Sequence, residues 1–142
     1  MRNKIALAAL LTVIGAAPAL AAVTVSGAWI RALPVSSPSG GYFTLHNDGK
    51  NAETLVGAAS PACGMLMLHQ SENKGGMSAM HEVTGVDVAP GGMLRFQPGS
   101  YHLMCMGAKP ILQPGAEVPV TLTFKSGETL TANFVVRNAA GK

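Results

Sequence analysis

Short stretches in which apolar and polar residues alternate, each ended by turn residues, constrain the fold of this chain most. The alternation is clearest over residues 118–124 and again over residues 130–136, with Ser126-Gly127 between them. A period of two places every second side chain on one face of a strand, and a short glycine-containing connection indicates a tight turn. These residues are therefore predicted to form a β-hairpin with one buried face.

Seven further strands are expected between segments rich in Gly, Pro, Asn and Ser. They cover residues 23–31, 41–47, 53–59, 64–69, 80–88, 92–97 and 101–106. The polar, glycine-rich run from Ser71 to Ser78 is expected to be a mobile loop. Nine short strands without a convincing amphipathic helix predict an all-β domain, either a sandwich or a barrel, and Greek-key topology is favoured.

The first 21 residues have the features of a secretory signal peptide. Arg2 and Lys4 precede an apolar run from Ile5 to Ala17, and Ala19-Leu20-Ala21 fits the small-residue cleavage rule. The apolar run is shorter than the roughly 20 residues that a membrane-spanning helix needs. We therefore expect residues 1–21 to be removed on export and residues 22–142 to form one domain.

The charge of the exported part argues against a polyanionic partner. The whole chain has 10 Lys and Arg against 7 Asp and Glu. Because Arg2 and Lys4 leave with the leader, the exported part is close to neutral. Neither nucleic acid nor an acidic membrane surface is therefore indicated as a partner. The sequence carries no signal for oligomers, so a monomer is the default expectation.

Two cysteines, Cys63 and Cys105, remain after export. A lone pair of cysteines in an oxidising compartment can form a disulfide, but unpaired cysteines also pack in cores as small apolar residues. The sequence leaves both alternatives open.

Methionines and histidines gather in one part of the sequence. Between residues 65 and 106 lie three of the four histidines, His69, His81 and His102, with seven methionines, Met65, Met67, Met77, Met80, Met93, Met104 and Met106. Thioether sulfur is a soft ligand that suits Cu(I), and imidazole suits copper in either oxidation state. The clustering therefore points to copper rather than to a hard cation such as magnesium or calcium.

The periodicity of strands selects four of these residues. His102 and Met104 are two positions apart, so a strand projects both from one face. His69 ends one predicted strand and Met80 begins another, and the Gly75-Gly76 segment between them can bring both to the same end of the sandwich. By contrast, Met65, Met67, Met93 and Met106 are expected to be core residues, and His46 a hydrogen-bonded structural residue.

The four selected residues reproduce a known pattern. His69, ten residues, Met80, twenty-one residues, His102, one residue and Met104 give H-x10-M-x21-H-x-M. This spacing resembles that of the periplasmic copper chaperones called the PCu(A)C family, or DUF461. The similarity extends over nearly all of residues 22–142, including residues 28–31 (AWIR), 42–47 (YFTLHN), 98–104 (PGSYHLM) and 120–124 (VTLTF).

The resemblance implies a cupredoxin-like β-barrel in the periplasm with one exposed Cu(I) site made by His69, Met80, His102 and Met104. It also implies delivery of copper to the CuA centre in subunit II of cytochrome c oxidase, together with Sco-type thiol proteins. Cys63 and Cys105 depart from the family pattern, so a disulfide or an added thiolate ligand is a further hypothesis. His81 and Met77 are candidate extra ligands for Cu(II).

Two other functions compete with copper delivery. A blue-copper electron carrier would share the fold but needs a Cys thiolate followed by His and Met, and no histidine follows Cys105. A secreted adhesion or carbohydrate-binding module would use the methionines for packing, but the chain has only one Trp and two Tyr for an aromatic platform. No nucleophile paired with a base is evident, so catalysis is not expected.

Overall fold

The computed structural model describes residues 22–142, so the predicted signal peptide at residues 1–21 lies outside the described residues. In the described part the chain forms strands and no helix, and correspondingly no helix there could cross a membrane. The strands are β1 (Val23–Arg31), β2 (Ser39–Asn47), β3 (Glu53–Ala59), β4 (Cys63–Lys74), β5 (Met77–Glu82), β6 (Val86–Val88), β7 (Met93–Phe96), β8 (Tyr101–Ala108), β9 (Glu117–Phe124) and β10 (Thr129–Arg137). The predicted all-β class is confirmed.

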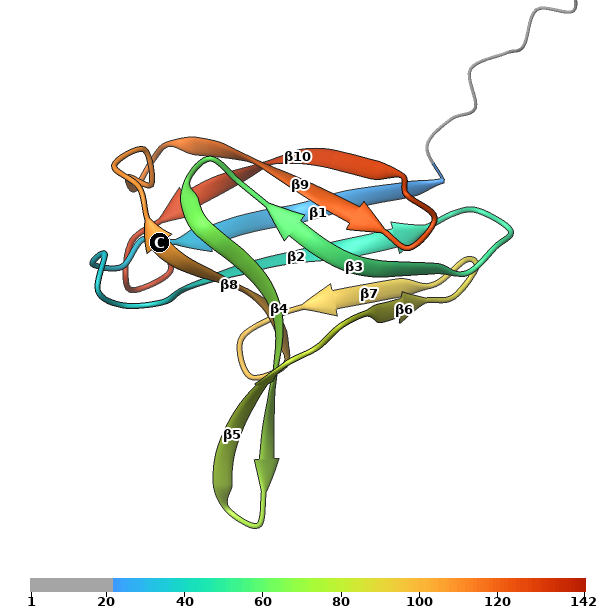
Figure 1. Ribbon diagram of the computed structural model, residues 1–142, viewed down its shortest axis with the longest axis horizontal. Coiled ribbons are helices and arrows are strands. Elements are labelled where there is room, and N and C mark those ends of the chain that lie inside the picture. The colour runs from blue at the N-terminus through green and yellow to red at the C-terminus, as the bar shows by residue number, and fades with distance from the viewer. Residues whose placement is uncertain (1–21) are drawn as a thin grey trace, which may run out of the picture.

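The strands form one hydrogen-bonded sheet that folds around a core (Figure 1). Its order is β5-β4-β8-β2-β1-β10-β9-β3-β6, and β7 pairs with β2 outside this path. Most neighbours are antiparallel, but β1 and β10 are parallel. The sheet begins at β5 and ends at β6 without closing, so the structure is an open sandwich rather than a closed barrel. Non-consecutive neighbours such as β2 and β8 arise from crossovers of the Greek-key kind.

The core takes side chains from every strand except β5. The largest fully buried side chains include Phe43 on β2, Leu103 on β8 and Phe134 on β10. The ring centroids of Phe43 and Phe134 lie 5.6 Å apart, so they join β2 and β10 across the interior. The predicted hairpin is confirmed as β9 and β10, since alternate residues from Val118 to Phe124 are buried.

The segment around Ser71 to Ser78 is a hairpin and not the expected loop. β4 continues to Lys74 and β5 starts at Met77, so only Gly75 and Gly76 form the turn. Both glycines have positive φ, 57° and 80°, as a two-residue turn of type I′ requires. This hairpin projects from the body of the sandwich (Figure 1), and all of β5 is exposed. Since neither face of its outer part is buried, its sequence shows no apolar alternation.

The predicted strand over residues 80–88 is accordingly wrong, because β5 ends at Glu82 and β6 starts at Val86. β5 pairs with β4, whereas β6 pairs with β3 at the other end of the sheet. The chain thus leaves the projecting hairpin and returns to the core between these two strands.

Candidate metal centre

The four predicted ligands lie on three adjacent strands and on the same face of the sheet. His69 on β4 is the register partner of His102 on β8, and Met80 on β5 is the partner of Ser71 on β4. Residues directly opposite each other in an antiparallel pair share a face, as do residues two positions apart along a strand. Ser71 lies two residues from His69, and Met104 lies two residues from His102, so all four side chains project from one face.

This face is the outer one. Leu103 and Cys105, whose side chains point to the opposite side from Met104, are fully buried in the core. The strand β8 therefore divides its residues between the core and the candidate site. The four residues predicted to lie together at one end of the sandwich lie instead on the outer face of the sheet, at the base of the β4–β5 hairpin. Three of them, Met80, His102 and Met104, line one pocket, whereas His69 does not line it.

The ring of His102 is held in one tautomer by a backbone contact. Its side chain is buried, with 4% exposed, and its Nδ1 lies 3.0 Å from the carbonyl oxygen of Ser100. Because a carbonyl can only accept, Nδ1 donates the hydrogen bond. The same carbonyl accepts from the backbone N–H of Ser71 on β4, 3.1 Å away. Nε2 of His102 is buried and has no hydrogen-bond partner, so in the neutral ring its lone pair is free for a metal ion.

The ring of His69 lies beside that of His102, with centroids 5.8 Å apart. Its Nδ1 is likewise buried without a partner. Burial lowers the pKa of His69, the charges of His102 and His81 lower it further, and Glu82 opposes this shift. The site therefore favours the neutral imidazole that a metal ion requires.

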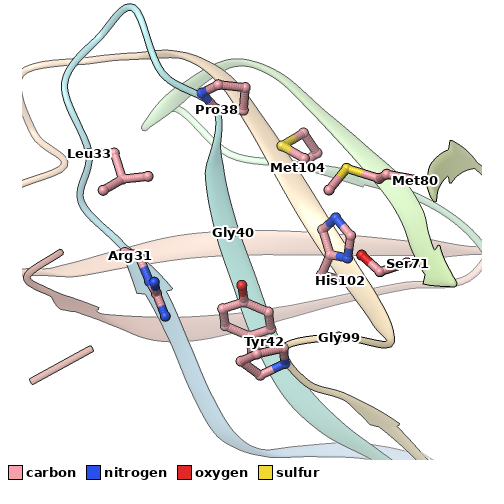
Figure 2. Close-up of a pocket in the computed structure, with 11 residues that line it drawn as sticks. Arg31, Leu33, Pro38, Gly40, Tyr42, Ser71, Met80, Gly99, His102 and Met104 are labelled. Atoms are coloured by element: carbon pink, nitrogen blue, oxygen red, sulfur yellow. The ribbon is translucent and has the colours of Figure 1, made fainter. Parts of the chain in front are cut away.

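A pocket of about 240 Å³ opens over these strands. Met80, His102 and Met104 line it, and Figure 2 shows the side chains of both methionines beside the imidazole of His102. Gly40 on β2 is the register partner of Met104, and a Cβ there would lie 2.8 Å from Cζ of Tyr42. The glycine thus lets the Tyr42 ring lie along the pocket floor. Arg31 also lines the pocket, and its Nε is buried without a partner.

Two soft sulfur atoms and two imidazole nitrogens are a donor set for a soft or borderline metal ion. Within residues 22–142 no group of three or more His, Cys, Asp and Glu side chains could hold a metal ion. The candidate site has a different composition, since half of its donors are thioethers.

Other residues that the sequence suggested as ligands lie elsewhere. His81 pairs with Gln70, and Met77 pairs with Lys74, so both belong to the face of the hairpin opposite Met80. Cys105 is fully buried in a disulfide with Cys63, which settles the open alternative and leaves no thiolate for copper. The blue-copper hypothesis loses its sulfur ligand in this state.

The expected packing roles are partly wrong. Met65, Met93 and Met106 are 58%, 55% and 39% exposed and do not belong to the core, whereas Met67 is half-buried. His46 does have the predicted structural role, since its Nε2 lies 3.0 Å from Oγ of Ser26.

Two neighbours of the site were not predicted from the sequence. Glu82 is the register partner of His69 on β5, and Ser100 orients His102 through its carbonyl. An acidic residue two positions after Met80 was a readable signal for Glu82. A backbone carbonyl has no sequence signal, so the role of Ser100 could be found only in the structure.

The sequence matches the model of a known family over most of its length. The profile of the LpqE-like family covers residues 23–136. Lxx21020 of Leifsonia xyli subsp. xyli, whose name describes a lipoprotein, is 34% identical over 120 residues, which are 84% of this chain and 72% of that protein. RP573 of Rickettsia prowazekii, an uncharacterized protein, is 32% identical over 103 residues, which are 72% of this chain and 57% of that protein.

Solved structures with the same fold include copper-bound domains. The CuI-DR1885 structure from Deinococcus radiodurans is 33% identical, with a TM-score of 0.68 over 88% of this chain and 84% of that one. The copper-bound PCuAC domain from PmoF2 has a TM-score of 0.69 over 84% of this chain and 96% of that one, but at 16% identity it supports the fold alone. The predicted cupredoxin-like fold class is confirmed.

Proposed function

Because this chain belongs to the LpqE-like family, we propose that it is an exported copper chaperone that carries Cu(I) as its cargo. The proposed ligands are His69, Met80, His102 and Met104. Support comes from CuI-DR1885, whose name states that it holds Cu(I) and whose sequence is a third identical to this one.

The observation that carries the proposal is the pair of buried imidazole nitrogens without partners. Nδ1 of His69 and Nε2 of His102 have no hydrogen bond, although burying a polar atom without one costs about 1–3 kcal/mol. The two rings are neighbours, and two thioethers share their face of the sheet. A bound Cu(I) ion would satisfy both nitrogens and use both sulfurs at once.

The ligand set suits delivery rather than permanent storage. All four donors are neutral, and Met80 is 53% exposed at the base of a projecting hairpin. An incoming thiolate or imidazole can replace such a thioether before the buried His102 releases the ion. Transfer is therefore proposed to occur by stepwise ligand exchange in a docked complex, with the exposed methionine leaving first.

The recipient and the compartment are proposed from the resemblance described above. The recipient is the CuA centre in subunit II of cytochrome c oxidase, with Sco-type thiol proteins as co-workers. The periplasm is the compartment, and the lipoprotein description of Lxx21020 supports export. Residues 22–142 are proposed as the exported domain, acting as a monomer.

The double variant His102→Ala/Met104→Ala tests the proposed ligands. It removes the buried nitrogen and one thioether, so it is expected to lose the high-affinity equivalent of Cu(I) in an anaerobic competition titration with a chromophoric chelator. His46→Ala is the matched control, because His46 is bonded to Ser26 away from the pocket. Retention of one tightly bound equivalent by the double variant would place the site elsewhere.

A further inference from the structure

The exposed methionines of β4 and β8 continue the candidate site along the sheet. Below the His69–His102 pair, Met67 is the register partner of Met104 and Met65 is the partner of Met106. These residues are spaced by two along each strand, so all project from the outer face together with the two histidines. The structure thus has three successive pairs of metal-binding side chains, of which the proposed function uses only part.

Packing does not explain why the side chains of Met65 and Met106 are exposed. Met65 is 58% exposed and Met106 is 39% exposed. Fully burying a methionine side chain typically gains about 1.5–3 kcal/mol, and these two positions forgo much of it. Among the described strands, none pairs with β4 on the side away from β8 at Met65 or Met67, since β5 covers only residues 69–74.

The geometry allows three sulfur atoms to converge. Directly opposite residues have Cβ atoms about 4.5–5.5 Å apart, and diagonal ones lie within reach of long side chains. Methionine is unbranched and has three rotatable bonds, so its sulfur can adjust to a shared ion. Met65, Met67 and Met106 therefore meet the spacing that a thioether site requires.

The surroundings select a soft monovalent ion. Residues 63–71 of β4 and residues 101–108 of β8 contain no charged side chain. Gln70 is one position away from His69 and so lies on the opposite face of β4. On the outer face a hard divalent cation would therefore find no carboxylate or amide side chain at these positions, whereas Cu(I) is well matched by neutral thioethers.

We propose that Met65, Met67 and Met106 form a second Cu(I) site, weaker than the first and adjacent to it. It is weaker because it lacks imidazole and is more exposed to water. Met67 lies next to Met104 across the strands, so an ion can pass between the two sites by exchanging one thioether at a time. This inference rests on the proposed function, because it supposes that the protein is exposed to Cu(I) where it works.

The test is an anaerobic Cu(I) titration of the protein purified from cells that express the full chain. Two competing chelators are used, one with high and one with low affinity for Cu(I). The wild type is expected to bind two equivalents, the second more weakly. Met65→Leu/Met106→Leu keeps apolar side chains of similar size and is expected to lose only the second equivalent. Met93→Leu is the matched control, since Met93 is similarly exposed but lies on β7 opposite His46. It is expected to keep both equivalents.

The NMR signals of the methionine methyl groups show which residues bind the second equivalent, independently of the stoichiometry. The signals of Met65, Met67 and Met106 are expected to shift between one and two equivalents of Ag(I), a redox-inert substitute for Cu(I), while that of Met93 stays in place.

Two outcomes would overturn the inference. They are binding of a single equivalent by the wild type, and a second equivalent that is still bound by the double leucine variant. Loss of the first equivalent in His102→Ala with the second retained separates the two sites. If the wild type binds Cu(I) only at the three methionines, the result contradicts the proposed function but leaves the further inference standing.

Discussion

At the scale of single residues, the proposed site depends on which histidine nitrogens carry protons. The hydrogen bond from His102 Nδ1 to the Ser100 carbonyl leaves Nε2 as the nitrogen that faces the pocket. Burial is the main cause that lowers the pKa of His69, and its neighbours His102 and His81 add to it. The ring of His102 is thus oriented with Nε2 toward the site, and His69 favours the neutral form that can bind an ion.

Copper affinity is expected to depend on pH through these rings. Methionine does not titrate, whereas a protonated histidine cannot bind metal, so the affinity for Cu(I) should fall as pH drops below about 6.5. Because the pKa of His69 is lowered, its share of the loss comes at lower pH than for an exposed histidine.

Competition titrations between pH 8 and pH 5 measure this dependence. His69→Met provides a comparison, since it replaces a titrating donor by a non-titrating one. In the acidic range it should reduce the slope of log affinity against pH by about one proton. An unchanged affinity from pH 7 to pH 5 would contradict histidine ligation.

At the scale of elements, a disulfide near the start of β4 and a turn after its end hold the site in place. The disulfide between Cys63 and Cys105 joins β4 to β8 across 42 residues of sequence, which by loop entropy adds about 4 kcal/mol to the free energy of unfolding. The Gly75-Gly76 turn then folds β5 back and places Met80 opposite Ser71. The disulfide fixes His69 relative to His102, and the turn positions Met80.

The variant Gly76→Val is expected to weaken copper binding without unfolding the domain. A β-branched residue is strained at the observed φ of 80°, so the turn should shift and carry Met80 away from the pocket. β5 adds nothing to the core, so the free energy of unfolding should change little.

Gly127→Val is the control in the other hairpin, where φ is 91° and both strands are part of the core. It should lower the free energy of unfolding by about 1–3 kcal/mol and leave copper affinity unchanged. Copper titration and chemical denaturation of both variants check the pair. Equal copper affinity in Gly76→Val and the wild type would show that Met80 does not depend on this turn.

The two hairpins also show what the sequence can predict. β9 and β10 were predicted because one face is buried, which imposes alternation on residues such as Val118 and Val120. The sequence predicts a loop over residues 71–78 because the outer part of the β4–β5 hairpin faces water on both sides and carries no apolar alternation. The prediction that Met65 and Met106 are core residues is wrong for a related reason. Alternation does not tell which face of a strand the core covers when both faces carry apolar side chains.

The site was predictable only in part. The spacing of His69, Met80, His102 and Met104 selected the four residues, but their meeting place depends on the pairing of β4 with β8. That pairing joins strands far apart in the sequence, and no local pattern encodes it. Its consequence, a site on the outer face with Met67 and Glu82 beside it, appears only in the structure.

At the scale of the whole molecule, the sandwich separates stability from metal handling. The core is enclosed by the inner faces of the strands, and the candidate ligands lie on the outer face of β4, β5 and β8. The hairpin beside them projects from the body of the sandwich (Figure 1). Exchange of an ion there does not require the core to open. This arrangement suits a protein that docks, transfers its cargo and remains folded with or without copper.

X-ray absorption spectroscopy at the copper edge tests the central claim most directly, because it counts the nitrogen and sulfur neighbours of the ion. With one equivalent of Cu(I) bound, we predict two nitrogen and two sulfur neighbours, and the loss of one sulfur in Met80→Leu. A first equivalent surrounded by sulfur alone, or by nitrogen and oxygen alone, would contradict the account.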